Sequence, residues 1–272
     1  VFAEADNYKI LKAAEMALEE SIAIPILLGN KKKINQIIEE YNLELSECEI
    51  IDPRSDAELN QRENFAKILH EKRKRRGLTF FESKKMMRER NYYASAMVET
   101  GVADVMISGI ERNYRDSIRP ALQVIGVENG INKIAGMYIL ISKEGPIFFA
   151  DTTVNIDPSV EEIVDITLLV ARTVKEYKIK PKIALLSYSN FGSNEGPDAV
   201  KMREAAKILH QNHPDLVVDG EIQANFAVNK ELNNDFFPFS MLANKSANTL
   251  IFPNLSAGNI AYKLVQEMSQ NE

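Results

Sequence analysis

Short apolar runs, rich in β-branched residues, alternate with amphipathic stretches of helical spacing from one end of the chain to the other. The apolar runs are residues 24–29, 49–53, 102–109, 135–141, 145–151, 182–187, 216–220 and 249–253. The stretches of helical spacing are residues 7–20, 32–41, 56–74, 79–100, 120–125, 159–177, 199–212 and a last one from Asn259. Parallel strands need helical crossovers, so this alternation predicts an α/β fold with mostly parallel sheets covered by helices on both faces.

The alternation forms two series that join near residue 131, which predicts two α/β/α domains, residues 1–131 and 132–272. A chain of 272 residues is long enough for two domains at ~100–200 residues each. Val1-Phe2-Ala3 reads as the second half of a buried strand, and residues 266–272 trail off from a helix without a domain-closing element. We therefore expect a fragment of a longer polypeptide, clipped at the start of its first domain.

Composition and residue spacing exclude several classes of protein. The formal net charge of −6 argues against general nucleic-acid binding, which needs clustered cations to neutralise phosphates. A single cysteine, Cys48, excludes an internal disulfide framework and a zinc cluster and fits a reducing, cytoplasmic location. No apolar run approaches the ~20 residues of a membrane-spanning helix. The histidines, His70, His210 and His213, lack metal-ligand spacing, so we expect no metal site.

Polar and small residues follow five of the predicted strands, at the edge where ligands bind in open α/β sheets. These strand-end loops are Ser108-Gly109, Asp151 with Asn155, residues 187–193, Asp219-Gly220-Glu221 and residues 254–259. Their hydroxyls and free N–H groups suit phosphate or carbonyl oxygens. Turn formation and helix capping explain the same residue types in any single loop. The five loops taken together favour a ligand cleft.

Two groups of basic residues stand out in this acidic chain. Residues 72–76 (KRKRR) could hold phosphates, or they could form a solvated helix C-terminus that Gly77 caps. The second group is Arg112, Arg115 and Arg119, which share one face of a helix at spacings of three and four. Asp116 could pair with Arg112 or with Arg119. The remaining cationic excess favours an anionic ligand, with a structural network as the alternative.

Six sequence blocks follow one another in a specific order. They are residues 101–109 (GVADVMISG), 118–125 (IRPALQVI), 149–155 (FADTTVN), 186–189 (LSYS), 219–223 (DGEIQ) and 252–263 (FPNLSAGNIAYK). The first resembles the G-x-A-D-x-x-x-S-G segment and the second the L-R-P-A-L-Q-x-I segment of the phosphate acetyltransferase (phosphotransacetylase) family. The resemblance covers essentially the whole chain. It implies two α/β/α domains with an active cleft between them, where acetyl-CoA and phosphate meet.

Three further segments are more similar to one branch of that family. They are residues 112–116 (RNYRD), 189–193 (SNFGS) and 236–240 (FFPFS). They resemble the C-terminal phosphotransacetylase-like domain of large bacterial NADP-dependent malic enzymes. In that group the domain follows a malic-enzyme catalytic domain and is regarded as a regulatory and oligomer-forming module that senses acetyl-CoA. A tethered malic-enzyme domain and a homo-oligomer are therefore the implied partners.

Two departures from the family pattern bear on catalysis. Phosphotransacetylases carry a Ser-Thr pair shortly before the arginine that matches Arg119, and here Asn113 and Tyr114 stand in those places. The family's Ser-Arg-Gly motif lies in a C-terminal segment that folds back onto the first domain, and this chain stops before it. Because those groups stabilise the reacting thiol and carbonyl, we expect no catalytic residue in this chain.

The resemblance also carries ligand-binding positions onto this chain. Arg73, in the pattern R-K-x-x-G-x-T, and Arg119 match the family's cleft arginines. With the strand-end residues, the expected cleft for CoA and acetyl phosphate consists of Arg73, Ser108, Arg119, Ser187, Ser189, Asn190, Gly192, Asn254, Asn259 and Lys263. No resident cofactor is expected in this chain, and acetyl-CoA is the implied ligand. NADP and Mg²⁺ or Mn²⁺ would serve the tethered malic-enzyme domain.

Three functions remain open at this point. The first is a regulatory module whose binding of acetyl-CoA changes the activity of a malic enzyme that decarboxylates malate to pyruvate. The second is an active phosphate acetyltransferase, which converts acetyl-CoA and phosphate into acetyl phosphate and CoA. The third is a purely structural dimerisation domain. The residues at positions 113 and 114 favour the first function over the second.

Overall fold

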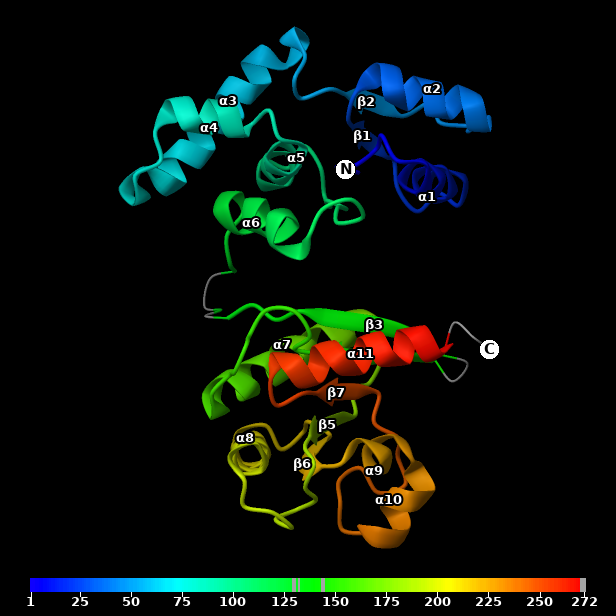
Figure 1. The fold of residues 1–272 in the computed structure, drawn as a ribbon, viewed down its shortest axis with the longest axis vertical. Helices are drawn as coiled ribbons and strands as arrows, with labels where there is room; N and C mark the ends of the chain where they lie inside the picture. Colours follow the sequence, from blue (N-terminus) through cyan, green and yellow to red (C-terminus); the bar gives the residue numbers. More distant parts are fainter. Residues whose placement is uncertain (129–130, 132, 143–144, 270–272) are drawn as a thin grey trace. The chain divides into compact units, whose positions relative to one another are not determined.

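The computed structural model describes residues 1–128, 131, 133–142 and 145–269 of the chain. The chain divides into two compact units, unit 1 (Val1–Glu128) and unit 2 (Asn129–Glu272) (Figure 1). Each unit has its own sheet and its own hydrophobic core.

Unit 1 is built around a small parallel sheet. Strands β1 (Ile26–Leu28) and β2 (Glu49–Ile51) pair in parallel, and Phe2 forms parallel bridges to Leu27 and Ile107. The helices of unit 1 are α1 (Tyr8–Glu19), α2 (Lys31–Tyr41), α3 (Leu59–Arg73), α4 (Phe80–Met86), α5 (Arg90–Glu99) and α6 (Tyr114–Val124), with 3₁₀ turns η1 (Asp56–Glu58) and η2 (Lys74–Arg76). Phe2 is buried between its two neighbours, which confirms the strand character expected for the first residues.

Helix starts in unit 1 follow from local capping chemistry. Asn7 and Asn30 cap α1 and α2 by accepting hydrogen bonds from backbone N–H groups of the first turn. Thr79 and Glu82 form a capping box at the start of α4.

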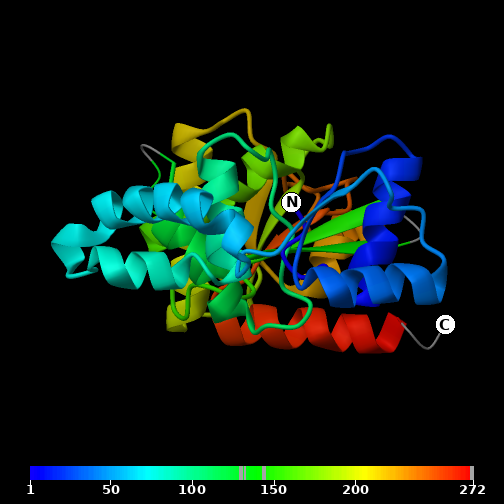
Figure 2. The ribbon, with the colours of Figure 1, turned by 90° about the horizontal axis from the view of Figure 1, so that it is seen from above.

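Helices α3 and α4 lie side by side in both views (Figures 1 and 2). The C-terminal end of α3 therefore stands beside the start of α4, with Gly77 in the turn between them.

Two segments of unit 1 differ from the prediction. Residues 79–100 form two helices, because Glu89 is extended and its carboxylate accepts a hydrogen bond from Arg112 at 2.8 Å, while Met87 is fully buried. These tertiary contacts outweigh the local preference for one continuous helix. Residues 102–109, expected as a buried strand, make only the bridge at Ile107, and Val102 and Val105 are more than half exposed. This segment is paired on one side only, by the first residues of the chain.

Unit 2 contains a five-stranded sheet in the order β3-β4-β7-β5-β6. The strands are β3 (Met137–Ser142), β4 (Gly145–Ala150), β5 (Ile183–Leu186), β6 (Val218–Ile222) and β7 (Thr249–Ile251). β3 pairs with β4 in antiparallel fashion, and the other neighbouring strands pair in parallel. The helices are α7 (Val160–Glu176), α8 (Pro197–Asn212), α9 (Ala224–Val228), α10 (Lys230–Phe236) and α11 (Leu255–Ser269).

Helices cover both faces of the sheet in unit 2. On one face, buried residues of α7 and α8 such as Ile166, Val170 and Met202 pack against the strands. On the other face, Ala227 of α9 and Tyr262 of α11 belong to a separate apolar cluster with the opposite side chains of the same strands. Burial on both faces explains why these strands read as continuous apolar runs.

The α/β class with mostly parallel sheets is confirmed. β3 is the antiparallel exception, and its pairing with β4 was expected from two adjacent apolar runs. Helices α9 and α10 were not predicted, because they are short and lack a sustained apolar period. Within the described ranges, no helix is long and apolar enough to cross a lipid bilayer.

Candidate functional site

The two groups of basic residues meet in unit 1. Helix α3 ends at Arg73, and the η2 turn carries Arg76 before Gly77 adopts the left-handed conformation with φ of 84°. Arg115 and Arg119 lie on α6 at a spacing of four, so they share a helix face. All four arginines line one cavity of about 670 Å³. Two segments that are far apart in sequence thus place their cations around a common space.

Most of these cations have no counter-charge among the described residues. There, the side chains of Arg73, Arg76 and Arg115 form no ion pair or hydrogen bond, and that of Arg119 lies 3.7 Å from a carboxylate oxygen of Asp116. Lys72, by contrast, is used structurally, because its Nζ donates to the carbonyl oxygen of Val124 at 2.6 Å. The other cations of the cavity remain available to an anion, which they would bind through charge-assisted hydrogen bonds.

Two smaller cavities adjoin the first one. The second, of about 270 Å³, shares Arg73, Arg76, Arg119 and Gln123 with the first, and the third, of about 220 Å³, shares Arg119 with both. Tyr92 lines the second and third cavities and donates a hydrogen bond from its hydroxyl to Gln123 at 2.7 Å. Burial raises the pKa of Tyr92, and the nearby Arg119 and Arg73 oppose this shift. Tyr92 therefore stays a neutral donor.

The arginine pattern expected from sequence needs one correction. Arg112 precedes the N-cap of α6, so it does not share a helix face with Arg115 and Arg119. Its guanidinium pairs with Glu89 at 2.8 Å, whereas Asp116 pairs with Arg119. The expectation that all three arginines share one face is wrong, because the helix begins two residues later than the spacing suggested.

The two residues that depart from the family pattern lie at the start of α6. Asn113 caps the helix, because its side-chain oxygen accepts from the backbone N–H of Asp116 at 3.0 Å and its amide donates to the Asp116 carboxylate at 2.8 Å. Tyr114 is the first helical residue and is 44% exposed. Both polar ends of the Asn113 side chain are therefore occupied inside the protein.

In unit 2, the expected strand-end residues gather at one edge of the sheet. β4, β7, β5 and β6 run in parallel, so their carboxyl ends meet there. Side chains link the loops across this edge: Asn190 accepts from the backbone N–H of Gln223 at 2.8 Å, and Asn259 donates to the carbonyl oxygen of Thr152 at 3.2 Å. The structure thus brings the unit 2 candidates together in one region.

The loop of residues 187–193 has its polar groups turned to partners within the protein. The hydroxyl of Ser189 is fully buried and donates to the carboxylate of Glu221 at 2.8 Å, and the Gly192 N–H donates to the same carboxylate oxygen at 2.8 Å. The N–H of Asn190 donates to Ser193 at 3.0 Å. The Ser187 hydroxyl accepts from the Ser189 N–H at 3.3 Å. The free N–H groups expected for phosphate binding are occupied here.

Asp151, at the end of β4, accepts hydrogen bonds from the loop that follows it, as Glu221 does from the loop of residues 187–193. One carboxylate oxygen accepts from the N–H groups of Gly136, Thr153 and Val154 at 2.8–3.1 Å. The other accepts from the N–H of Asn155 at 2.8 Å. Asp151 is 2% exposed. Its carboxylate therefore supports the fold of this loop and does not face a ligand.

The remaining predicted residues are not among those that line the arginine cavities. Asn254 caps the start of α11 by accepting from the N–H of Ala257 at 3.0 Å. Lys263 is exposed, with its ammonium group 5.9 Å from the ring centre of Tyr262. Ser108, in unit 1, donates from its hydroxyl to the side-chain oxygen of Asn91 at 3.0 Å. Of the expected set, only Arg73 and Arg119 line the same cavities.

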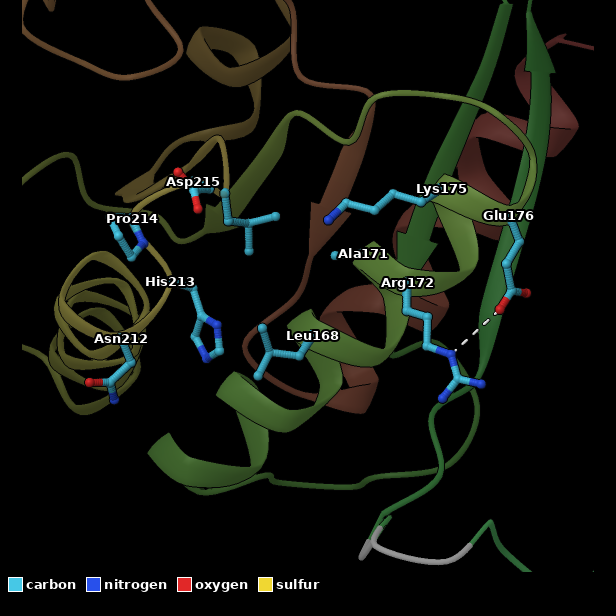
Figure 3. Close-up of a pocket in the computed structure, with 10 residues that line it drawn as sticks. Leu168, Ala171, Arg172, Lys175, Glu176, Asn212, His213, Pro214 and Asp215 are labelled. Atoms are coloured by element: carbon cyan, nitrogen blue, oxygen red, sulfur yellow. Dashed lines mark ion pairs between the residues drawn. The ribbon is translucent and has the colours of Figure 1, made fainter.

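A further cavity, of about 630 Å³, lies in unit 2 at the opposite, amino edge of the strands (Figure 3). It is lined by the last turns of α7 and α8 and the segment that leads into β6. Figure 3 shows Arg172 turned toward Glu176, with which it forms an ion pair at 3.5 Å. The cavity contains none of the predicted residues, and its charges are mixed.

Several lining residues were missed by sequence reasoning. Tyr92 and Gln123 are the first of these. Gln123 lies in the family-like block 118–125 but was not singled out, and Tyr92 has no sequence signal beyond the helix that carries it. Arg76 was part of the basic run, and its approach to Arg115 depends on the packing of α3 near α6. No group of metal-ligating side chains occurs among the residues that the structure covers.

Comparison with known proteins places this geometry in a family. The family model described as "Phosphate acetyl/butaryl transferase" matches residues 1–272. The phosphate acetyltransferase of Clostridium acetobutylicum is 35% identical over 99% of this chain and 82% of its own length. An NAD-dependent malic enzyme of Rhizobium meliloti is 34% identical over the whole chain, which spans 35% of that protein. A solved phosphotransacetylase from Streptococcus pyogenes has a TM-score of 0.84 and 34% identity, covering 99% of this chain and 81% of that one.

Proposed function

The chain belongs to the phosphate acetyl/butaryl transferase family, and from this premise we propose that it is an acetyl-CoA-sensing, oligomer-forming module of a malic enzyme. The observation that carries the proposal is a set of guanidinium groups, Arg73, Arg76 and Arg115, that line one cavity with Arg119 and have no ion-pair partner among the residues the structure describes. CoA carries phosphates that need such partners. The apolar residues of the same cavity, such as Leu122 and Ile125, suit its adenine ring.

The start of α6 supports binding without transfer chemistry. The side chain of Asn113 is occupied in capping the helix, so it offers no free donor of the kind that a hydroxyl supplies in the family pattern. Tyr114 adds bulk at the next position. A site that retains arginines but lacks small hydroxyl groups holds an anion more readily than it stabilises a reacting carbonyl.

Regulation requires that acetyl-CoA bind two states of the assembly with different affinity. In our proposal these states belong to a homo-oligomer in the cytoplasm, in which a malic-enzyme domain of the same polypeptide decarboxylates malate to pyruvate with Mg²⁺ or Mn²⁺. The Rhizobium meliloti relative is named as NAD-dependent. The use of NADP is therefore a prediction that rests on the resemblance of the segments near residues 112, 189 and 236.

Calorimetric titration of this chain with acetyl-CoA tests the binding step. We expect saturable binding that weakens at least tenfold in R73A and in R119A, because each removes charge-assisted hydrogen bonds. R75A is the matched control, since Arg75 belongs to the same basic run but lines none of the three cavities. Absence of binding by the unmodified chain would reject the sensing module and leave the purely structural one.

An active phosphate acetyltransferase is the second candidate. It is favoured by the 35% identity to the Clostridium acetobutylicum protein of that name. The two candidates differ in CoA-dependent release of phosphate from acetyl phosphate, which the sensing module does not catalyse. Brisk turnover by the parent protein, measured with the malic-enzyme reaction in parallel, would establish the second candidate and end the first as stated.

A further inference from the structure

The cavity at the amino edge of the unit 2 strands has a lining in which opposite charges balance. Its charged side chains are the cations Arg172 and Lys175 and the carboxylates Glu176 and Asp215. Arg172 and Glu176 lie one turn apart on α7 and pair with each other at 3.5 Å. Because the two signs balance, this lining does not favour a polyanion such as a nucleotide. It differs in this respect from the arginine-lined cavities of unit 1.

Lys175 and Asp215 are the two charges of this cavity that the protein leaves unpaired. In the part of the chain that the structure describes, neither side chain forms an ion pair or a hydrogen bond. Figure 3 shows them on opposite walls, with the Lys175 side chain of α7 extended toward the wall that carries Asp215. A ligand between these walls would therefore meet an ammonium group on one side and a carboxylate on the other.

The end of α8 adds negative potential on the wall that carries Asp215. Asn212 is the last residue of this helix, His213 caps it, and both line the cavity. Pro214 follows and has no N–H group to offer to the last carbonyl oxygens of the helix. The partial negative charge of a helix C-terminus stabilises a nearby cation. This wall therefore favours an ammonium group of the ligand.

The remaining part of the lining is apolar. Ala171 and Leu216 are 4% and 8% exposed, and Leu168 packs against the core of unit 2. The ring of His213 also turns into the cavity (Figure 3). A volume of about 630 Å³ accommodates a small molecule, and an aliphatic group on this surface would leave water.

We propose that this cavity binds an aliphatic α-amino acid in its zwitterionic form. The carboxylate of the ligand accepts hydrogen bonds from the ammonium group of Lys175, and the ammonium group of the ligand donates to the carboxylate of Asp215. The aliphatic side chain lies on Leu168, Ala171 and Leu216. The site lies wholly within unit 2 and shares no residue with the arginine-lined cavities, so the inference goes beyond the proposed function and does not depend on it.

Titrations of this chain with three ligands, followed by ligand-observed NMR, test the assignment of each charge. The ligands are L-leucine, leucinamide, which lacks the carboxylate, and 4-methylpentanoate, which lacks the ammonium group. For the unmodified chain we expect saturable binding of L-leucine and binding of each analogue that is about tenfold weaker or more, because each analogue loses one charge-assisted hydrogen bond.

The variants K175A and D215A assign the two ends of the ligand. In K175A the affinity for L-leucine falls about fivefold or more, while that for leucinamide changes by less than about twofold. In D215A the affinity for L-leucine falls by a similar factor, and it is 4-methylpentanoate whose affinity is retained. K180A and D165A are the matched controls, since Lys180 and Asp165 are exposed residues of unit 2 outside the lining of this cavity, and both bind L-leucine like the unmodified chain.

Three results would overturn the proposal. The first is a failure of L-leucine to bind the unmodified chain, and the second is unchanged binding of L-leucine in both K175A and D215A. The third is an equal loss of L-leucine and leucinamide in K175A, because Lys175 would then not act on the carboxylate. Acetyl-CoA, titrated into the same samples, should bind K175A and D215A like the unmodified chain, so the outcome for the proposed function is read separately.

Discussion

Replacement of Asp151 by alanine tests whether this strand-end carboxylate serves the fold. The substitution leaves the backbone N–H groups of Gly136, Thr153, Val154 and Asn155 without their acceptor. At about 1 kcal/mol for each of these partly buried donors, the expected loss in the free energy of unfolding is about 4 kcal/mol. Near the melting temperature of a domain of this size, that loss corresponds to a decrease of roughly 8–16 °C.

The measurement is chemical and thermal unfolding of D151A beside D151N and the unmodified chain. D151N keeps the shape but turns an amide toward donors, so it is also destabilised, by a smaller amount. D157N is the control, since the Asp157 side chain is 76% exposed and pairs with Lys201 at 2.7 Å. A loss of less than 1 kcal/mol in D151A would contradict the structural role and return Asp151 to the candidate ligand-binding residues.

Three further outcomes follow from single contacts. Burial and a hydrogen bond to Glu58 raise the pKa of Tyr93. The contribution of the neutral Tyr93 to the free energy of unfolding is therefore present below ~pH 10 and is lost at higher pH. Y93F should show a flatter dependence of the unfolding free energy on pH above ~pH 10. The hydrogen bond from Lys12 lowers the pKa of buried Glu15, so E15Q should be less stable than the unmodified chain at about pH 7. The difference should shrink as the pH falls below the unfolded-state pKa of glutamate, because the contribution is lost when the folded carboxylate becomes protonated. A Cβ at Gly258 would lie 2.3 Å from the backbone carbonyl oxygen of Asp151, at the end of β4. G258A should therefore lower the free energy of unfolding, measured in urea, by about 1–3 kcal/mol. A loss near zero would show that α11 shifts freely.

The sequence predicted the type and order of most helices and strands because periodicity and capping are local. The paired apolar runs of β3 and β4, the α7 helix capped by Ser159 and the buried β5 all occur where they were expected. Short elements such as α9 were missed, since five residues cannot display a helical period. Residues 102–109 were expected as a buried strand, and the structure pairs them on one side only. Apolar composition could not reveal this, because it does not show how many neighbours a strand has.

The candidate site was predicted in part. Arg73 and Arg119 could be identified from motifs, and the structure places both around the same cavities. The fate of the loop at residues 187–193 could not be read from its sequence, because the carboxylate of Glu221 that occupies its donors comes from another strand. Serine and glycine suit a phosphate and a buried carboxylate equally well. Only tertiary pairing distinguishes the two.

The buried Glu221 beneath this loop has a consequence for how related chains should be compared. Replacing Ser189 removes a hydroxyl donor from a carboxylate that is fully buried, and a side chain at position 192 would strain a backbone with φ of 90° whose N–H holds the same carboxylate. Selection for folding alone is therefore enough to keep these residues unchanged. Invariance of such a loop across relatives would then reflect the loss of folding free energy when one buried carboxylate is left without its donors. It would carry no information on whether a substrate ever touches the loop.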